Sequence, residues 1–126
     1  MSTNIDIFVD AQTGLEEFAA ELEILLQIKL TRIDENAEIY YAFRNSQIDM
    51  TLGTHEFDND RDMNFEDYNY DISVRALNLE SEEKRKQWRE RFAFEIFEKL
   101  KATDKYDLMM IENIQIKLAE FHPKSS

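Results

Sequence analysis

The 126-residue chain contains no cysteine, a single proline and only two glycines. Without cysteine it has no disulfide, no thiolate metal site and no thiol nucleophile. A chain that does without disulfides suits a reducing compartment, so we expect a cytoplasmic protein. So few prolines and glycines leave no flexible linker between domains. The sequence therefore predicts one domain over residues 1–126, with frayed ends at 1–4 and 123–126.

Long apolar runs and catalytic motifs are missing as well. No apolar run approaches the roughly 18 residues of a membrane-spanning helix, and the first ten residues lack the basic start of a signal peptide. The two histidines, His55 and His122, are distant in sequence, and there is neither a nucleophile elbow nor a glycine-rich phosphate loop. The sequence therefore predicts a non-catalytic protein that needs no metal or cofactor.

Negative charge is what the chain has in excess. Its 27 acidic and 15 basic residues give a formal net charge of -12. Residues 1–80 hold 18 acids and 5 bases, whereas residues 81–126 hold 9 acids and 10 bases. Such a field repels nucleic acid and anionic membranes and steers basic proteins towards the chain. We therefore expect a basic protein partner and no direct contact with nucleic acid or membrane, although acids that only maintain solubility would give the same charge.

Acidic and aromatic residues are concentrated together in residues 55–71, which we name the acidic segment. It holds seven acids and four aromatic residues around one base, Arg61, without glycine or proline. Carboxylates alone would form a solvated loop and aromatic residues alone would form core, so the mixture favours a surface that binds a positively charged partner. The residues that we expect to contact this partner are Asp58, Asp60, Asp62, Glu66, Asp67, Tyr68, Tyr70 and Asp71.

The tyrosines of this set allow two interpretations. Tyr68 and Tyr70 are two positions apart in an alternating stretch, so we expect them on one face of a strand, with Tyr40 from a neighbouring strand beside them. They would form either ordinary sheet packing or a surface that faces the partner. The second interpretation is favoured by the acids next to them, Asp67 and Asp71, because tyrosine is common at the centre of protein interfaces.

Two other kinds of site fit the acidic segment less well. Residues 58–62 have the acid spacing of a calcium loop, but Met63 stands where glycine is needed and Asn69 where glutamate is needed. A pair of carboxylates could act as acid and base on a glycoside, but that chemistry needs a desolvated carboxyl in a cleft. A solvated loop explains these acids more simply than either site.

Hydrophobic periodicity predicts an α+β fold. Short apolar or alternating stretches predict strands at 5–9, 28–33, 38–44, 48–52, 68–74 and 108–111. Two amphipathic helices are expected, one after a capping box of Thr13 and Glu16 and one from Ser81 to about Lys101. Residues 113–121 fit a helix or a strand, and we prefer a helix. The order β-α-β-β-β-β-α-β-(α) predicts an antiparallel sheet of about five or six strands with two main helices packed mainly on one face.

The second predicted helix combines an apolar stripe with a basic cluster. Apolar side chains recur every four residues from Trp88 to Leu100, so we expect Trp88 in the core. The basic residues are interleaved with glutamates, which favours an exposed, salt-bridged helix face over a phosphate-binding site. This basic cluster, expected to face outwards, consists of Lys84, Arg85, Lys86, Arg89 and Arg91.

The string FEDYNYDI, residues 65–72, follows a run of acids in a small acidic chain without cysteine. In these features the chain resembles the immunity proteins of bacterial toxin systems, both polymorphic and contact-dependent. The resemblance implies a dedicated cytoplasmic inhibitor of a partner toxin, often a basic nuclease. It also implies that carboxylates of the inhibitor cover the active site of the toxin in place of phosphates.

Three other functions stay open from the sequence alone. A nucleic-acid mimic would use the same carboxylates against a DNA-binding protein, and a regular, phosphate-like spacing of surface acids would favour it. A structural subunit or homodimer would associate through the aromatic strand surface, and its mass in solution would depend on concentration. A small-molecule enzyme would need a deep pocket lined by perturbed carboxylates.

Overall fold

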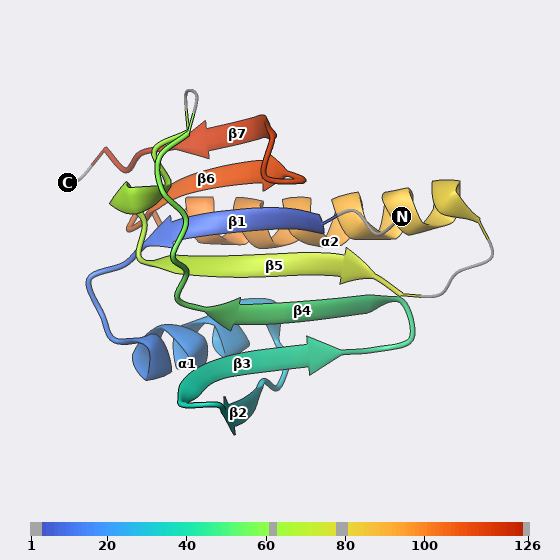
Figure 1. Ribbon diagram of the computed structural model, residues 1–126, viewed down its shortest axis with the longest axis horizontal. Helices are drawn as coiled ribbons and strands as arrows, with labels where there is room; N and C mark the ends of the chain where they lie inside the picture. Colours follow the sequence, from blue (N-terminus) through green and yellow to red (C-terminus); the bar gives the residue numbers. More distant parts are fainter. Residues whose placement is uncertain (1–3, 61–62, 78–80, 125–126) are drawn as a thin grey trace.

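The computed structural model describes residues 4–60, 63–77 and 81–124 (Figure 1). These residues form one antiparallel sheet of seven strands with two α-helices, so the predicted α+β class is confirmed, with more strands than expected. None of the helices in these residues is long and apolar enough to cross a membrane. The strands are β1 (Asn4–Asp10), β2 (Thr31–Glu35), β3 (Glu38–Arg44), β4 (Ile48–Gly53), β5 (Tyr70–Ala76), β6 (Asp107–Glu112) and β7 (Ile116–Phe121). The helices are α1 (Leu15–Leu26), α2 (Glu82–Ala102) and a short 3-10 helix, η1 (Phe65–Asp67).

The strands lie in the order β2-β3-β4-β5-β1-β6-β7, with β2 and β7 at the two edges. The strand at one edge, β7, replaces the helix that we preferred for residues 113–121. Asn113 and Ile114 adopt positive φ angles of 55° and 56°, which turns the chain back towards β6 instead of starting a helix. The resulting hairpin pairs backbone groups of β6 that a helix would leave without hydrogen bonds.

The two helix starts differ in how they are capped. The capping box predicted for α1 is wrong, because Gly14 and not Thr13 precedes the helix, which moves Glu16 out of the position that reaches back to the cap. The Thr13 carbonyl instead accepts a hydrogen bond from the Tyr70 hydroxyl at 2.6 Å. The predicted cap of α2 is confirmed: Ser81 Oγ accepts a hydrogen bond from the backbone N–H of Lys84 at 3.1 Å.

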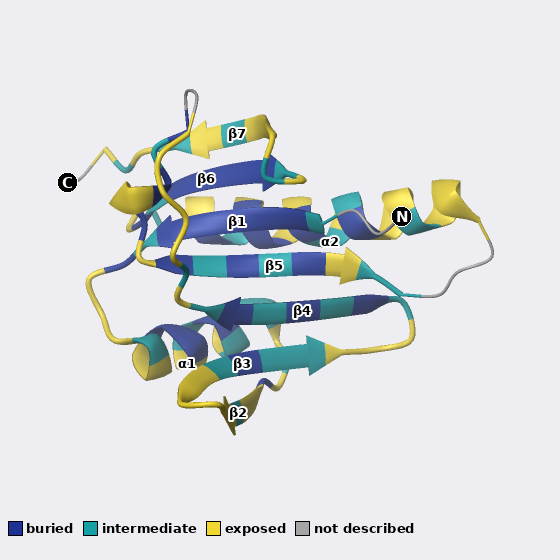
Figure 2. Cartoon of the chain, viewed as in Figure 1, coloured by how far each residue is buried: buried dark blue, intermediate teal, exposed yellow. Residues whose placement is uncertain are grey.

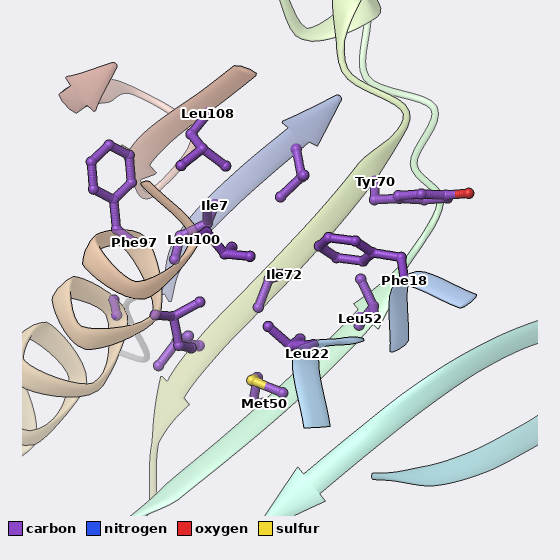
Figure 3. Close-up of a cluster of buried hydrophobic side chains, with 14 of the residues drawn as sticks. Ile7, Phe18, Leu22, Met50, Leu52, Tyr70, Ile72, Phe97, Leu100 and Leu108 are labelled. Carbon is purple, nitrogen blue, oxygen red and sulfur yellow. The ribbon is translucent and has the colours of Figure 1, made fainter. Parts of the chain in front are cut away.

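The main hydrophobic core lies between the sheet and the two helices, which cover the same face (Figures 1 and 3). In Figure 1, α1 lies behind β3 and β4, and α2 lies behind the other half of the sheet. Leu22 of α1 and Leu100 of α2 are fully buried against strand residues such as Ile7 and Ile72. Burying an aliphatic side chain of this size stabilises a fold by about 1.5–3 kcal/mol, so this layer supplies most of the driving force.

The buried stripe of α2 differs from the predicted one. Trp88 is 37% exposed, whereas Arg89, expected to face outwards, is only 4% exposed. A strict spacing of four residues advances about 40° beyond a full turn at each step, so three steps from Leu100 carry Trp88 roughly 120° away from the sheet. The stripe that follows the true helical repeat passes through Leu100, Ile96, Phe97 and Ala93 to Arg89.

The opposite face of the sheet, which points towards the viewer in Figure 1, is here named the front face. Cross-strand pairing arranges its side chains in rows that run across the strands. One row consists of Tyr40, Gly53, Asp71, Phe8 and Met109. The next row consists of Ala42, Thr51, Ser73, Asp6 and Ile111. The rows place polar groups over β4 and β5 and apolar groups over β6, so the front face changes character across the sheet.

Candidate functional site

The acidic segment leaves β4 and crosses in front of the sheet before it returns as β5 (Figure 1). Its apolar residues cover the apolar half of the front face and form a second core. The ring of Phe65 lies 4.9 Å from that of Phe8, in edge-to-face geometry. The buried members of this second core are Phe8, Met63, Phe65, Tyr68, Met109 and Ile111. The aromatic residues of the segment therefore anchor it to the sheet.

The expectation that Tyr68 and Tyr70 share one face is wrong. Tyr68 is 3% exposed and belongs to the second core on the front face, whereas Tyr70 lies in the main core and stacks on Phe18 with ring centroids 5.6 Å apart. The reason is that β5 begins only at Tyr70, and Tyr68 ends η1 before the regular alternation starts. Both rings pack inside the fold, and neither forms a patch that faces a partner.

The predicted acids of the loop lie on its outer side. Asp58, Asp60, Glu66 and Asp67 are exposed (Figure 2), and Asp62 lies outside the described residues. Two of them also order the segment. Glu66 Oε2 accepts a hydrogen bond from the Asn59 N–H at 3.0 Å, and Asp67 Oδ2 accepts one from Asn64 Nδ2 at 2.7 Å. These four carboxylates thus face solvent, and two of them hold the segment between Asn59 and Asp67 through hydrogen bonds.

Asp71, the last of the predicted residues, has a different environment on β5. It points to the front face, where a side-chain hydrogen bond joins it to Asp6 of the adjacent strand β1. Burial, the negative charge of Asp6 and this hydrogen bond raise the pKa of Asp71 well above its ordinary value. Burial also raises the pKa of Asp6, which is 4% exposed. The two carboxyl groups therefore titrate as a pair, and the pair resists full ionisation.

A groove opens beside Asp71 because the neighbouring position in its row is Gly53. Gly53 lines the groove between Tyr40 and Asp71, and a Cβ there would lie only 3.3 Å from the Cβ of Tyr40, so a larger residue would require Tyr40 to shift. The cavity here has a volume of about 620 Å³, and a second one of about 330 Å³ adjoins it through shared lining residues. We name this hollow the Asp71 groove; its main lining side chains are Glu38, Tyr40, Thr54, His55, Phe57 and Asp71.

His55 forms a fixed wall of the Asp71 groove. Its Nε2 lies 2.7 Å from the Tyr68 carbonyl oxygen, which can only accept, so Nε2 carries the proton. Its Nδ1 accepts a hydrogen bond from the Phe57 N–H at 3.1 Å, and its ring contacts Phe8 at a centroid distance of 5.0 Å. Both nitrogens are occupied in the neutral ring, so His55 shapes the groove and is not poised to act as a general base.

The lining of the Asp71 groove suits a positively charged group. Among the described residues, no three histidine, cysteine or acidic side chains are placed to hold a metal ion. The groove offers acceptor oxygens and aromatic surface, and none of the described residues that line it is a lysine or arginine.

Sequence reasoning missed both Asp6 and Gly53. The alternation of residues 5–9 places Asp6 on the polar side of its strand, but nothing in the sequence shows that Asp71 would cover it.

Comparison of the chain with models of protein families, with curated proteins and with solved structures found no match. The function therefore has to be inferred from the residues of the site.

Proposed function

We propose that the protein is a non-catalytic acidic binding protein that neutralises a basic partner, in the manner of the bacterial immunity proteins that it resembles. The partner would be a toxin such as a nuclease domain, met in the cytoplasm. The observation that carries this proposal is the construction of the acidic segment. Exposed carboxylates on its outer side stand on an aromatic second core that fixes the backbone beneath them.

A fixed array of carboxylates suits recognition of a basic surface. Negative potential speeds the encounter with a basic protein and favours correct orientation. Because hydrogen bonds hold the backbone N–H groups of Asp60 and Asp67, and that of Asn59 beside Asp58, less conformational entropy is lost when a partner binds. The same carboxylates could stand in for the phosphates of a nucleic acid in the active site of a nuclease.

The proposal is tested with two variants of equal net charge. The first, Asp58→Asn, Asp60→Asn and Asp67→Asn, removes three acids of the segment; the second, Glu16→Gln, Glu35→Gln and Glu98→Gln, removes three exposed acids elsewhere. Wild-type protein and both variants are used to capture proteins from a lysate of the source organism at low and moderate salt. We expect one basic protein in stoichiometric amount with the wild type and the control, and a loss of about tenfold or more in its affinity for the first variant. Equal capture by all three proteins would contradict the proposal.

A second candidate function, self-association, is favoured by one observation on α2. Trp88 and Phe94 are exposed on the outer side of the helix, where they line a cavity of about 480 Å³ with Arg91, whose guanidinium lies 5.8 Å from the Trp88 ring centroid. Tryptophan and arginine are typical of interface centres. Sedimentation at increasing concentration tests this alternative: a mass that rises in the wild type and stays monomeric in Trp88→Ala would support a homodimer.

A further inference from the structure

The carboxyl group of Asp71 has an unsatisfied acceptor at the Asp71 groove. Its Oδ1 is buried and has no hydrogen-bond partner, although the rest of the side chain lines the cavity. Buried polar atoms in folded proteins are nearly always paired, so an orphaned oxygen beside a cavity indicates a missing donor. The terminal torsion of aspartate is broad, so the carboxyl group of Asp71, which lines the groove, can turn to meet a donor there.

The walls of the groove indicate which donor fits. Tyr40 and His55 present aromatic surface, and Phe57 is 39% exposed at the mouth. Glu38 and Glu56 add two carboxylates at the rim. A planar guanidinium stacks on aromatic rings, donates several hydrogen bonds in one plane and gives up its water more readily than an ammonium group. These properties match arginine better than lysine.

We propose that the Asp71 groove receives the side chain of an arginine of the basic partner, with the guanidinium hydrogen-bonded to the Asp71 carboxyl group and stacked against Tyr40 and Phe57. This inference rests on the proposed function, since the arginine is presented by the partner that the acidic segment attracts. It adds a specific contact on the front face, beside the acidic segment, to a recognition otherwise based on surface charge. A buried arginine in such a pocket would be a centre of the interface, whereas the exposed acids would act mainly on the encounter.

Binding of the guanidinium displaces a proton. In the free protein the Asp6–Asp71 pair resists full ionisation, whereas the positive charge of the ligand favours the ionised carboxylate. The proton leaves to solvent as the cation enters, so the affinity rises with pH. The other titratable groups that face Asp71 are His55 and Glu56 from the acidic segment and Glu38 and Tyr40 from β3.

The test uses Nα-acetyl-arginine N-methylamide as the probe and the equivalent citrulline compound, which has nearly the same shape without charge, as its control. The full-length protein is titrated with each probe by NMR. We expect saturable shifts of the backbone amides of Gly53, Thr54 and Asp71 with arginine, at least about tenfold weaker binding of citrulline, and tighter arginine binding at higher pH. The side-chain carboxyl carbon of Asp71 should move towards the carboxylate position as arginine is added. Equal binding of both probes, or no site-specific shift with arginine, would overturn the inference.

Three variants locate the contact. Asp71→Asn should lose arginine binding by about tenfold or more, and Gly53→Ala should do the same by filling the floor of the groove. Glu98→Gln, on the exposed side of α2 behind the sheet, should bind the probe like the wild type. If a groove variant fails to fold, the shift of the Asp71 carboxyl carbon in the wild type still tests whether arginine binds at Asp71. Arginine binding that survives in both groove variants would overturn the inference. If the arginine probe binds but no basic protein is captured, the groove is still an arginine site, and only the proposed function is refuted.

Discussion

Asp6 and Asp71 come from the adjacent strands β1 and β5 and share a side-chain hydrogen bond on the front face of the sheet. Two carboxyl groups this close cannot both ionise without strong repulsion, so the pair is stable only while it keeps a proton. The fold thus maintains a destabilising feature at the point where the Asp71 groove opens. Such a feature is typical of functional sites, where binding requirements outweigh stability.

The acid pair predicts a pH dependence of stability. Because the pKa of Asp71 in the folded protein lies above the roughly 3.9 of an unfolded aspartate, the stability that this group confers is complete below pH 4 and falls as the pH rises through the folded pKa. Between pH 4 and pH 8 we expect the free energy of unfolding of the wild type to fall relative to that of Asp71→Asn. The expected fall is about 1.4 kcal/mol for each unit by which folding raises the pKa of Asp71. Urea unfolding of both proteins at several pH values measures this difference, with Asp67→Asn as the control. Parallel curves for wild type and Asp71→Asn would show that the pair does not share a proton.

The helix caps give a contrast between two hydroxyl residues. Ser81 Oγ accepts the Lys84 N–H, so Ser81→Ala should lower the free energy of unfolding by about 1 kcal/mol. Thr13 makes no side-chain cap to α1, so Thr13→Ala should change it by less than about 0.5 kcal/mol. Chemical denaturation of the two variants checks both values. A loss in Thr13→Ala as large as that in Ser81→Ala would mean that α1 starts one residue earlier than the structure shows.

The second core should be required to hold the acidic segment in place. Phe65 is almost completely buried against Phe8, so Phe65→Ala should cost about 3–5 kcal/mol of unfolding free energy and also weaken capture of the basic partner. Phe57 also contacts Phe8 and Phe65 but is 39% exposed, so Phe57→Ala should cost less than Phe65→Ala, about 1–2 kcal/mol. Thermal unfolding and the capture assay measure the two effects. Full partner binding by folded Phe65→Ala would show that the segment needs no anchor.

The ring of His122 is expected to lose its proton at a higher pH than an ordinary histidine. Hydrogen bonds from its ring to Asp107 Oδ1 at 2.7 Å and Glu120 Oε2 at 2.6 Å raise its pKa above the ordinary histidine value. The stability that this pairing confers is therefore present below the unfolded pKa of histidine and is lost as the pH rises through the folded one. NMR titration of the ring protons should show the raised pKa, and Glu120→Gln should lower it. An identical midpoint in wild type and Glu120→Gln would mean that the contact does not form in solution.

The sequence predicted those features that depend on local pattern. Alternation along 48–52 is sufficient to predict β4, and the serine before α2 is sufficient to predict where that helix begins, because period and capping are local properties. The exposure of Trp88 and the burial of Arg89 were missed because a strict spacing of four residues drifts away from the helical repeat, whereas the stripe that follows the repeat from Leu100 ends at Arg89, a charged residue. The choice of strand for β7 likewise depends on an edge of β6 that needs a partner.

The candidate site was predicted only in part for the same reason. The exposed acids lie close together in the sequence and form a visible cluster, whereas Asp6 and Asp71 are 65 positions apart and meet only through strand pairing. Tyr68 and Tyr70 were assigned to one face because the start of β5 depends on η1, which has no clear signal in the sequence. A groove created by an absent side chain, that of Gly53, is visible only once its neighbours are known.

We propose that carboxylates of the acidic segment recruit a basic partner, and the salt dependence of the association rate constant measures this recruitment. The constant is determined from about 20 mM to about 200 mM salt for the captured partner with three proteins: wild type, the triple variant Asp58→Asn, Asp60→Asn and Asp67→Asn, and the matched control with three acids removed elsewhere. We expect the rate constant to fall steeply with salt for wild type and control, and to be smaller and less dependent on salt for the triple variant. The same salt dependence in all three proteins would rule out this recruitment.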